Sequence, residues 1–281
     1  MDLDVVDLDH FYRRTALGRA AAEMLARRVS GLWPEMRGEA LAGFGFALPV
    51  LERIGRGAAR TLALMPGRIG VRRWPETEKA GGAPDGARPG NRAVLVAEDA
   101  WPLGDSFLDR LVVMHGLEIA DDPVALLHEA WRVLTPGGRA LVIVPNRAGF
   151  WARAESTPFG HGRPYSLRQI ERLLRQCRFM PTRHASALYM PPSARRFWLQ
   201  LAPLWERIGQ RMPMVTAGGA LIVEAEKQVY APRQGGLPEL VRGPLTVIEG
   251  LGRPAPAAGR AGGRERGWAR RMVRPRHREA R

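Results

Sequence analysis

Residues 98–146 read EDAWPLGDSFLDRLVVMHGLEIADDPVALLHEAWRVLTPGGRALVIVPN, and this stretch decides the fold. Two of its segments, residues 109–115 and 139–146, are almost continuously apolar, which is typical of strands buried on both faces of a sheet. Between them, residues 121–134 form a predicted helix with aspartate at its start and proline in its first turn, both favourable there. The segment TPGG then makes a tight turn. This order of strand, helix and strand predicts a parallel unit.

The residues before this stretch extend the same pattern. The predicted strands are residues 39–44, 61–65 and 92–99. Residues 48–57 form a predicted helix between the first two strands, closed by glycine. We therefore expect a doubly wound, mostly parallel α/β sheet. Residues 1–37 precede this sheet as a helical segment, in which residues 8–30 place their apolar side chains near one helical face.

The residues after this stretch complete the domain, which we assign to residues 38–230. A helix is predicted at residues 165–179, capped by Ser166, and strands are predicted at residues 183–190 and 219–228. The segments that we place outside this regular pattern are an exposed loop at residues 75–91, a helical insertion at residues 191–213 and a disordered basic tail at residues 231–281.

The helical insertion carries an apolar face. Trp198, Leu201, Trp205 and Ile208 fall on one side of a helix that Pro203 interrupts. Such a face predicts packing over a sheet edge or against a second subunit. Arginines also occur in the insertion, at positions 195, 196, 207 and 211. Peripheral contact with a membrane or an apolar substrate is therefore the alternative.

The net charge of the 281-residue chain is +15 at pH 7, which invites a nucleic-acid interpretation. Residues 232–281 hold twelve arginines against four glutamates, so +8 of the charge belongs to the tail. Only Lys79 and Lys227 are lysine among the 43 basic residues, a bias more typical of general arginine usage than of a binding face. A nucleic-acid reader is therefore disfavoured, and a polyanion-binding tail is the alternative.

Cys177 is the only cysteine, which excludes an internal disulfide and a cysteine-based zinc site within this sequence. It lies in a predicted amphipathic helix, where a buried structural thiol is expected. We find no metal-ligand cluster and no apolar window long enough for a transmembrane helix. The acidic first residues are unlike a signal peptide, so we expect a cytoplasmic protein.

A glycine turn, Gly43-Phe44-Gly45, follows the first predicted strand. Glycine lets backbone approach a ligand without a Cβ atom in the way. A dinucleotide fingerprint would need another glycine at Leu48, so an NAD enzyme is disfavoured. The turn alone does not identify the ligand.

The chain resembles the class I S-adenosylmethionine (SAM)-dependent methyltransferases, and within them the group called methyltransferase type 11. Residues 98–146 match the order of that family's motifs: an acidic residue followed by alanine, Ser-Phe-x-Asp, an apolar strand, Leu-Glu, and Glu-x-x-Arg-Val-Leu-x-Pro-Gly-Gly. The similarity extends over roughly residues 10–228. It implies a Rossmann-like sheet of seven strands with an antiparallel last strand, and SAM bound at the carboxyl ends of the early strands.

The resemblance assigns roles residue by residue. Asp99 corresponds to the carboxylate that accepts from the adenine amino group, with Ala100 beside the ring. His115 corresponds to the lining of the methionine moiety, and a hydrogen-bonded structural histidine is the alternative. The whole implied cofactor-binding set is Gly43, Phe44, Gly45, Met65, Asp99, Ala100 and His115.

Two positions depart from the family. The acid expected two residues before the first glycine is Leu41 here, and the acid expected on the ribose hydroxyls is Met65. Losing a charged hydrogen bond weakens binding by about 1.5–3 kcal/mol. A non-catalytic binding or scaffold protein with a decayed SAM pocket is therefore the alternative to an enzyme.

The predicted loop after the fifth strand, residues 152–166, should overhang the methyl group of the cofactor. His161 and Tyr165 are the candidates there for contact with substrate or for acid–base chemistry, and structural roles are the alternative. We expect a SAM-dependent methyltransferase that acts on a small-molecule or lipid-like acceptor, as a monomer or homodimer. The sequence assigns no catalytic residue.

Overall fold

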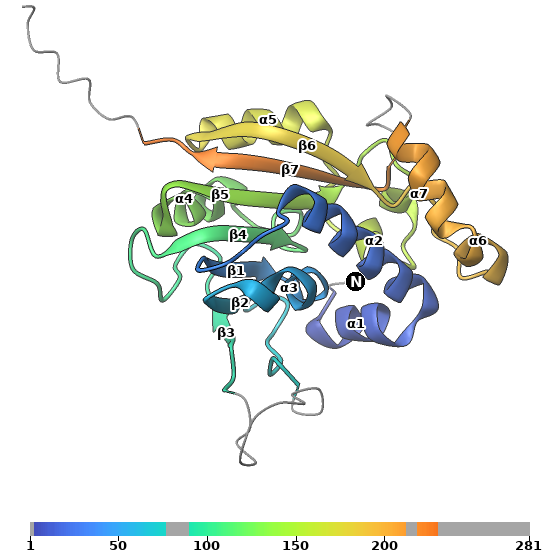
Figure 1. Cartoon of the computed structure of the whole chain (residues 1–281), viewed down its shortest axis with the longest axis horizontal. Coiled ribbons are helices and arrows are strands. Elements are labelled where there is room, and N and C mark those ends of the chain that lie inside the picture. Colours follow the sequence, from blue (N-terminus) through green and yellow to red (C-terminus); the bar gives the residue numbers. More distant parts are fainter. Residues whose placement is uncertain (1–2, 77–89, 212–217, 230–281) are drawn as a thin grey trace, which may run out of the picture. The chain divides into compact units, whose positions relative to one another are not determined.

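A seven-stranded sheet forms the centre of the fold, with the strand order β3-β2-β1-β4-β5-β7-β6 (Figure 1). The strands are β1 (Ala40–Gly45), β2 (Arg60–Pro66), β3 (Ala93–Val96), β4 (Leu108–Met114), β5 (Leu134–Pro145), β6 (Phe179–Ala187) and β7 (Ala220–Lys227). The first five pair in parallel, and β7 runs antiparallel to both β5 and β6. This confirms the predicted Rossmann-like sheet with an antiparallel last strand.

The computed structural model describes residues 3–76, 90–211 and 218–229. Residues 1–231 form one compact unit. The predicted disordered tail and most of the predicted loop at residues 75–91 lie outside the described residues.

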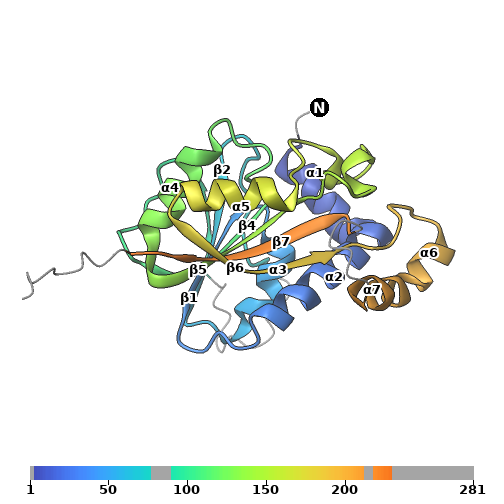
Figure 2. The same ribbon diagram turned by 90° about the horizontal axis from the view of Figure 1, so that it is seen from above.

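Helices cover both faces of the sheet (Figure 2). One face packs against α2 (Ala16–Leu32) and α3 (Leu48–Ile54), and the other against α4 (Pro123–Val133) and α5 (Leu167–Gln176). Side chains along β4 alternate between the two: Val112 and Met114 join the α2–α3 side, whereas Leu111 and Val113 join the α4–α5 side. All four are fully buried, which explains why the strand reads as a continuous apolar run.

The N-terminal helical segment is broken rather than continuous. It consists of α1 (Val5–Asp9), the π-helical turn η1 (His10–Arg14) and α2. The break is at Thr15, whose backbone is extended and whose hydroxyl accepts a hydrogen bond from the backbone N–H of Gly18. Thr15 is thus the N-cap of α2, a role that threonine performs well.

Three strands differ from their predicted bounds by more than one residue. β3 ends at Val96, so that Asp99 lies in the following loop. β5 begins at Leu134 and continues through the TPGG segment, because Leu134 pairs with Leu108 on β4. β6 begins at Phe179 rather than residue 183, where antiparallel pairing with β7 extends it. Tertiary pairing, which a local pattern does not contain, explains the last two differences.

The helical insertion forms α6 (Arg196–Gln200) and α7 (Ala202–Arg211). The two helices lie beside α2 and the end of β6 (Figures 1 and 2). The helix is interrupted at Leu201, two residues before the predicted interruption at Pro203. Trp205 and Ile208 are exposed, so within the chain they do not pack over a sheet edge, and the other half of the prediction, packing against a second subunit, stays a prediction. The inward side of α7 carries small and polar residues instead.

Candidate functional site

The order of the strands reverses between β1 and β4, and their carboxyl ends meet there. Gly45 ends β1 and Met114 ends β4, and the backbone N–H of Phe46 donates to the carbonyl oxygen of Met114 at 2.8 Å. In open α/β sheets, ligands bind outside the carboxyl ends of the strands at such a reversal. This edge is therefore the candidate site.

Three polar side chains from distant parts of the chain meet at this edge. His115, directly after β4, has its Nε2 atom 2.6 Å from the hydroxyl of Tyr12 and its Nδ1 atom 3.1 Å from Oε1 of Glu118. All three residues are buried. Burial and the charge of Glu118 raise the pKa of Tyr12 well above its ordinary value, so its hydroxyl stays protonated. Tyr12 can then donate to Nε2 while Nδ1–H donates to Glu118, which satisfies the imidazole ring.

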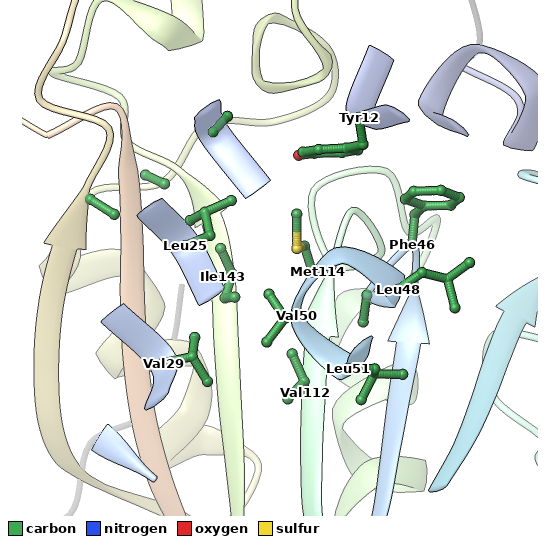
Figure 3. Close-up of a cluster of buried hydrophobic side chains, with 14 of the residues drawn as sticks. Tyr12, Leu25, Val29, Phe46, Leu48, Val50, Leu51, Val112, Met114 and Ile143 are labelled. Carbon is green, nitrogen blue, oxygen red and sulfur yellow. The ribbon is translucent and has the colours of Figure 1, made fainter. Parts of the chain in front are cut away.

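The N-terminal segment holds Tyr12 over the strand ends. The Tyr12 ring stacks on Phe46, with ring centroids 5.9 Å apart and an interplanar angle of 14°. Figure 3 shows the two rings facing each other above Met114. At the other end of the segment, the backbone N–H of Val5 donates to the carbonyl oxygen of Ile69, in the loop after β2, at 2.8 Å. The residues of α1 and η1 thus cover the carboxyl ends of β1, β2 and β4.

Little space remains beneath this cover. A cavity of about 10 Å³ lies between Leu8, Ile69 and His115. A second cavity, of about 220 Å³, lies beside the loop after β4. It is lined by Leu3, Arg68, Glu118, Ile119, Ala120, Asp121, His161, Gly162 and Arg163. We call this second cavity the edge cavity.

Glu118 is the most distinctive group in the edge cavity. Its side chain is 1% exposed, and its Oε1 atom faces His115. Its Oε2 atom is buried and has no hydrogen-bond partner among the residues that the structure describes. A buried carboxylate oxygen without a partner is costly. A ligand that donates a hydrogen bond would remove this cost.

The glycines of the predicted turn are required by internal packing. A Cβ atom on Gly45 would lie 2.3 Å from the carbonyl oxygen of Met114, and the φ angle of Gly45 is +82°. A Cβ atom on Gly43 would lie 2.7 Å from side-chain atoms of both Ala47 and Leu51. The contact at Gly45 is with backbone and excludes any other residue, whereas a side chain at Gly43 would require Ala47 and Leu51 to shift. These glycines would be needed with or without a ligand.

The other predicted cofactor residues do not gather at one place. Phe44 is buried on the α4–α5 side, where its ring stacks on Trp101 at 5.0 Å. Met65 is fully buried in the cluster that contains Tyr12. Asp99 and Ala100 are exposed in the loop after β3, and Asp99 forms no hydrogen bond or ion pair with any described residue.

The two predicted substrate residues lie in the loop after β5. His161 lines the edge cavity, and its Nε2 atom is 2.9 Å from the carbonyl oxygen of Glu155. Tyr165 is half-buried, and its backbone N–H donates to the carbonyl oxygen of Pro145 at 2.9 Å. Burial and the charge of Glu118 raise the pKa of Tyr165, with Arg163 acting in the opposite direction.

Sequence reasoning missed Tyr12 and Glu118 as parts of the site. Glu118 stands three residues after His115, in the loop that follows a buried strand, and this position was a usable signal. Tyr12 gave no such signal, because its partner His115 is 103 residues away in the sequence. Among the described residues, no three histidine, cysteine, aspartate or glutamate side chains come together as metal ligands would.

The space at this edge can be compared with the size of SAM, the cofactor that the resemblance implies. Pockets for ligands of this size hold about 300–1,000 Å³, whereas the edge cavity holds about 220 Å³. In this conformation the covered edge does not fit the whole of SAM, because Leu8 and Tyr12 lie over the ends of β1 and β4. Displacement of α1 and η1 is the change that would enlarge it.

Comparison with known proteins agrees with this fold. Residues 47–142 match the family described as methyltransferase domain. A SAM-dependent methyltransferase from Thermotoga maritima, a possible histamine N-methyltransferase, is 18% identical and superposes with a TM-score of 0.50, covering 75% of this chain and 92% of its own.

Two further methyltransferase structures superpose less well. A SAM-dependent methyltransferase from Aquifex aeolicus is 14% identical with a TM-score of 0.46, and the match covers 74% of this chain and 92% of that one. An S-adenosylmethionine-dependent methyltransferase from Mesorhizobium loti is 16% identical with a TM-score of 0.46, and the match covers 74% of this chain and 98% of that one. Among curated proteins, none matches this sequence.

Proposed function

We propose that the chain is a SAM-dependent methyltransferase that transfers a methyl group to a small-molecule or lipid-like acceptor, and the match of residues 47–142 to a methyltransferase domain supports this. SAM supplies an electrophilic methyl group when bound, so the protein's main contribution is to position the acceptor. The observation that carries this proposal is Glu118, a residue that lines the edge cavity and whose buried Oε2 atom has no hydrogen-bond partner among the described residues.

The edge cavity suits an acceptor that carries a hydroxyl or amino group. If displacement of the N-terminal segment exposes Oε2 of Glu118, such a group would donate a hydrogen bond to it, and Glu118 would hold the proton that the acceptor loses. His161 lines the same cavity. Tyr165 remains protonated because its pKa is raised, so it would act as a hydrogen-bond donor and not as a base.

The resemblance assigns the adenine contact to Asp99, and its exposed, unpaired carboxylate supports that role. Ala100 lies beside it and is also exposed. Gly43, Gly45 and His115 would contribute only after α1 and η1 have moved, because the N-terminal segment covers them. We therefore infer that SAM binding is coupled to opening of residues 5–14.

Isothermal titration of the full chain with SAM, and separately with S-adenosylhomocysteine, tests this function. We expect binding of both, and an affinity about tenfold weaker in Asp99→Ala, since a hydrogen bond to a charged group contributes about 1.5–3 kcal/mol. Glu35→Ala removes an exposed carboxylate elsewhere and should leave the affinity unchanged. Absence of heat with either ligand would exclude the proposed enzyme. Equal affinities for wild type and Asp99→Ala would exclude the adenine assignment.

A non-catalytic binding or scaffold protein is the second candidate. Leu41 and Met65, which replace two family acids, are both fully buried in the same cluster as Tyr12, and this favours a pocket that has closed. The same titrations separate the two candidates. Among the described helices, none is long and apolar enough to cross a membrane. A cytoplasmic location and a monomeric or homodimeric state belong to the proposal.

A further inference from the structure

Helix α7 turns a face of small and polar residues toward the protein and a face of large apolar residues toward solvent. Its buried face consists of Ala202, Glu206 and Gly209. Glu206 accepts a hydrogen bond from the backbone N–H of Tyr189 at 3.3 Å. A Cβ atom on Gly209 would lie 2.2 Å from the Tyr189 ring, so this face packs closely against the segment after β6. A surface helix normally turns its apolar stripe inward, and this one does not.

The outward face of α7 carries large apolar side chains. Leu204 is 51% exposed, and Trp205 and Ile208 are also exposed. In α6, Phe197 is 63% exposed. Trp198 links the two helices, with its ring centroid 5.4 Å from that of Phe197 and 5.8 Å from that of Trp205. We call Phe197, Trp198, Leu204, Trp205 and Ile208 the apolar ridge.

The exposed charges that residues 191–209 themselves contribute have one sign. Arg195, Arg196 and Arg207 are exposed, and none of them forms an ion pair with a described residue. Glu206 is the only acidic residue between positions 191 and 211, and it is buried. The exposed charges of the two helices next to the ridge are therefore cationic, and the nearby Glu23 of α2 is already paired with Arg27 and Arg53.

A groove lies on the inner side of the same helices. It holds about 560 Å³ between α2, β6, α6 and α7. Its lining includes the apolar side chains of Met24 and Leu199, together with Arg28 and Arg207. The Nε atom of Arg28 is buried and has no hydrogen-bond partner among the described residues. Because this atom is shielded from solvent, it is not available to a ligand outside the groove.

We propose that the apolar ridge docks on the surface of an anionic phospholipid bilayer. The ridge would enter the boundary between headgroups and acyl chains, where tryptophan is favoured. Arg195, Arg196 and Arg207 would lie at the phosphate level. A second copy of the chain fits this surface less well, because it would bring two sets of unpaired arginines together.

Cosedimentation of the full chain with vesicles tests this proposal. The chain should bind vesicles of equimolar phosphatidylcholine and phosphatidylglycerol, and bind them less at high salt. Leu204→Ala/Trp205→Ala should lower the partition coefficient by about a hundredfold, since each of the two large apolar side chains changes such an equilibrium by about tenfold. Arg195→Ala/Arg196→Ala should lower it by about fivefold for each charge, and only on the anionic vesicles.

Matched controls come from the described surface. Leu95 on β3 is 51% exposed, like Leu204. It lies on the edge strand opposite β6, the strand beside which the ridge helices pack. Arg56 is an exposed arginine elsewhere. Leu95→Ala and Arg56→Ala should leave vesicle binding unchanged. Circular dichroism of each variant verifies that it is folded.

Several outcomes would overturn the docking proposal. One is vesicle binding that survives both ridge variants and disappears when residues 232–281 are deleted, which would assign it to the basic tail. Another is wild-type dimerisation, measured by light scattering, that the ridge variants abolish without any vesicle binding. Because titration with S-adenosylhomocysteine is measured separately on the same variants, failure of docking is distinguishable from failure of the proposed methyl transfer.

Discussion

Removing one hydroxyl group, in Tyr12→Phe, should raise the affinity of the chain for S-adenosylhomocysteine. The hydroxyl makes the 2.6 Å hydrogen bond to Nε2 of His115 that joins η1 to the end of β4. Phenylalanine keeps the ring that stacks on Phe46, so the substitution removes a polar contact and little packing. The segment of residues 5–14 would then open more easily.

The magnitude follows from the burial of this contact. Tyr12 and His115 are both almost completely buried, and losing one partner of a buried hydrogen bond costs about 1–3 kcal/mol. If binding requires the open state, the apparent dissociation constant equals the intrinsic constant divided by the open fraction. Weakening the closed state by that amount should tighten apparent binding by about fivefold to a hundredfold, as long as the closed state predominates.

Isothermal titration of both proteins with S-adenosylhomocysteine measures this effect. Tyr189→Phe is the matched control, because Tyr189 is a partly buried tyrosine whose hydroxyl bonds to Ser186 on β6, three strands away from β4 in the sheet. It should lose a similar amount of stability and show unchanged affinity. Equal or weaker binding by Tyr12→Phe, alongside a normal loss of stability, would refute the idea that the N-terminal segment controls access.

Three further predictions concern stability and reactivity. Burial alone would raise the pKa of Glu224, but hydrogen bonds led by that from Arg183 outweigh it and lower the pKa to about 2. The lowered pKa means that ionised Glu224 stabilises the fold, and this contribution is fully present above the unfolded pKa of about 4.3. Denaturant titrations should therefore show the free energy of unfolding fall by on the order of 3 kcal/mol as pH falls towards 2, and Glu224→Gln should reduce this pH dependence. Gly45→Ala should destabilise the chain by more than about 3 kcal/mol, because its Cβ would lie 2.3 Å from a backbone oxygen, whereas Gly57→Ala in open space should change stability by less than about 1 kcal/mol. Burial raises the pKa of Cys177 to about 11, so a thiol reagent at about pH 8 should modify it only after denaturation, and rapid labelling of the native chain would contradict this.

The parallel core of the fold was predictable because its signals are local. The continuous apolar run of β4 and the aspartate and proline that begin α4 appear in adjacent residues, and the structure keeps both. The start of β6 was not predictable in this way. The helix before it ends where Arg178 adopts a φ of +63°, a conformation that glycine usually supplies. An arginine in that position carries no such signal.

The candidate site was predictable as a place but not as a set of contacts. Strand order puts Gly45 and His115 at the same edge, and any parallel sheet of this kind would do so. The residues that occupy the edge come from elsewhere: Tyr12 reaches it only because α1 and η1 fold back over the sheet. A contact between residues 103 positions apart depends on tertiary packing, which no window of sequence contains.

The two missing acids and the covered edge have a common physical basis. Leu41 and Met65 are both fully buried in one cluster with Tyr12 and Phe46. A carboxylate at either position would be removed from water without a partner, at a cost of several kcal/mol. Acidic residues at these two positions suit a sheet edge that stays open to solvent. Apolar residues there suit an edge that the chain itself covers. Binding that begins at the exposed Asp99 and proceeds by displacing Tyr12 is therefore consistent with both substitutions.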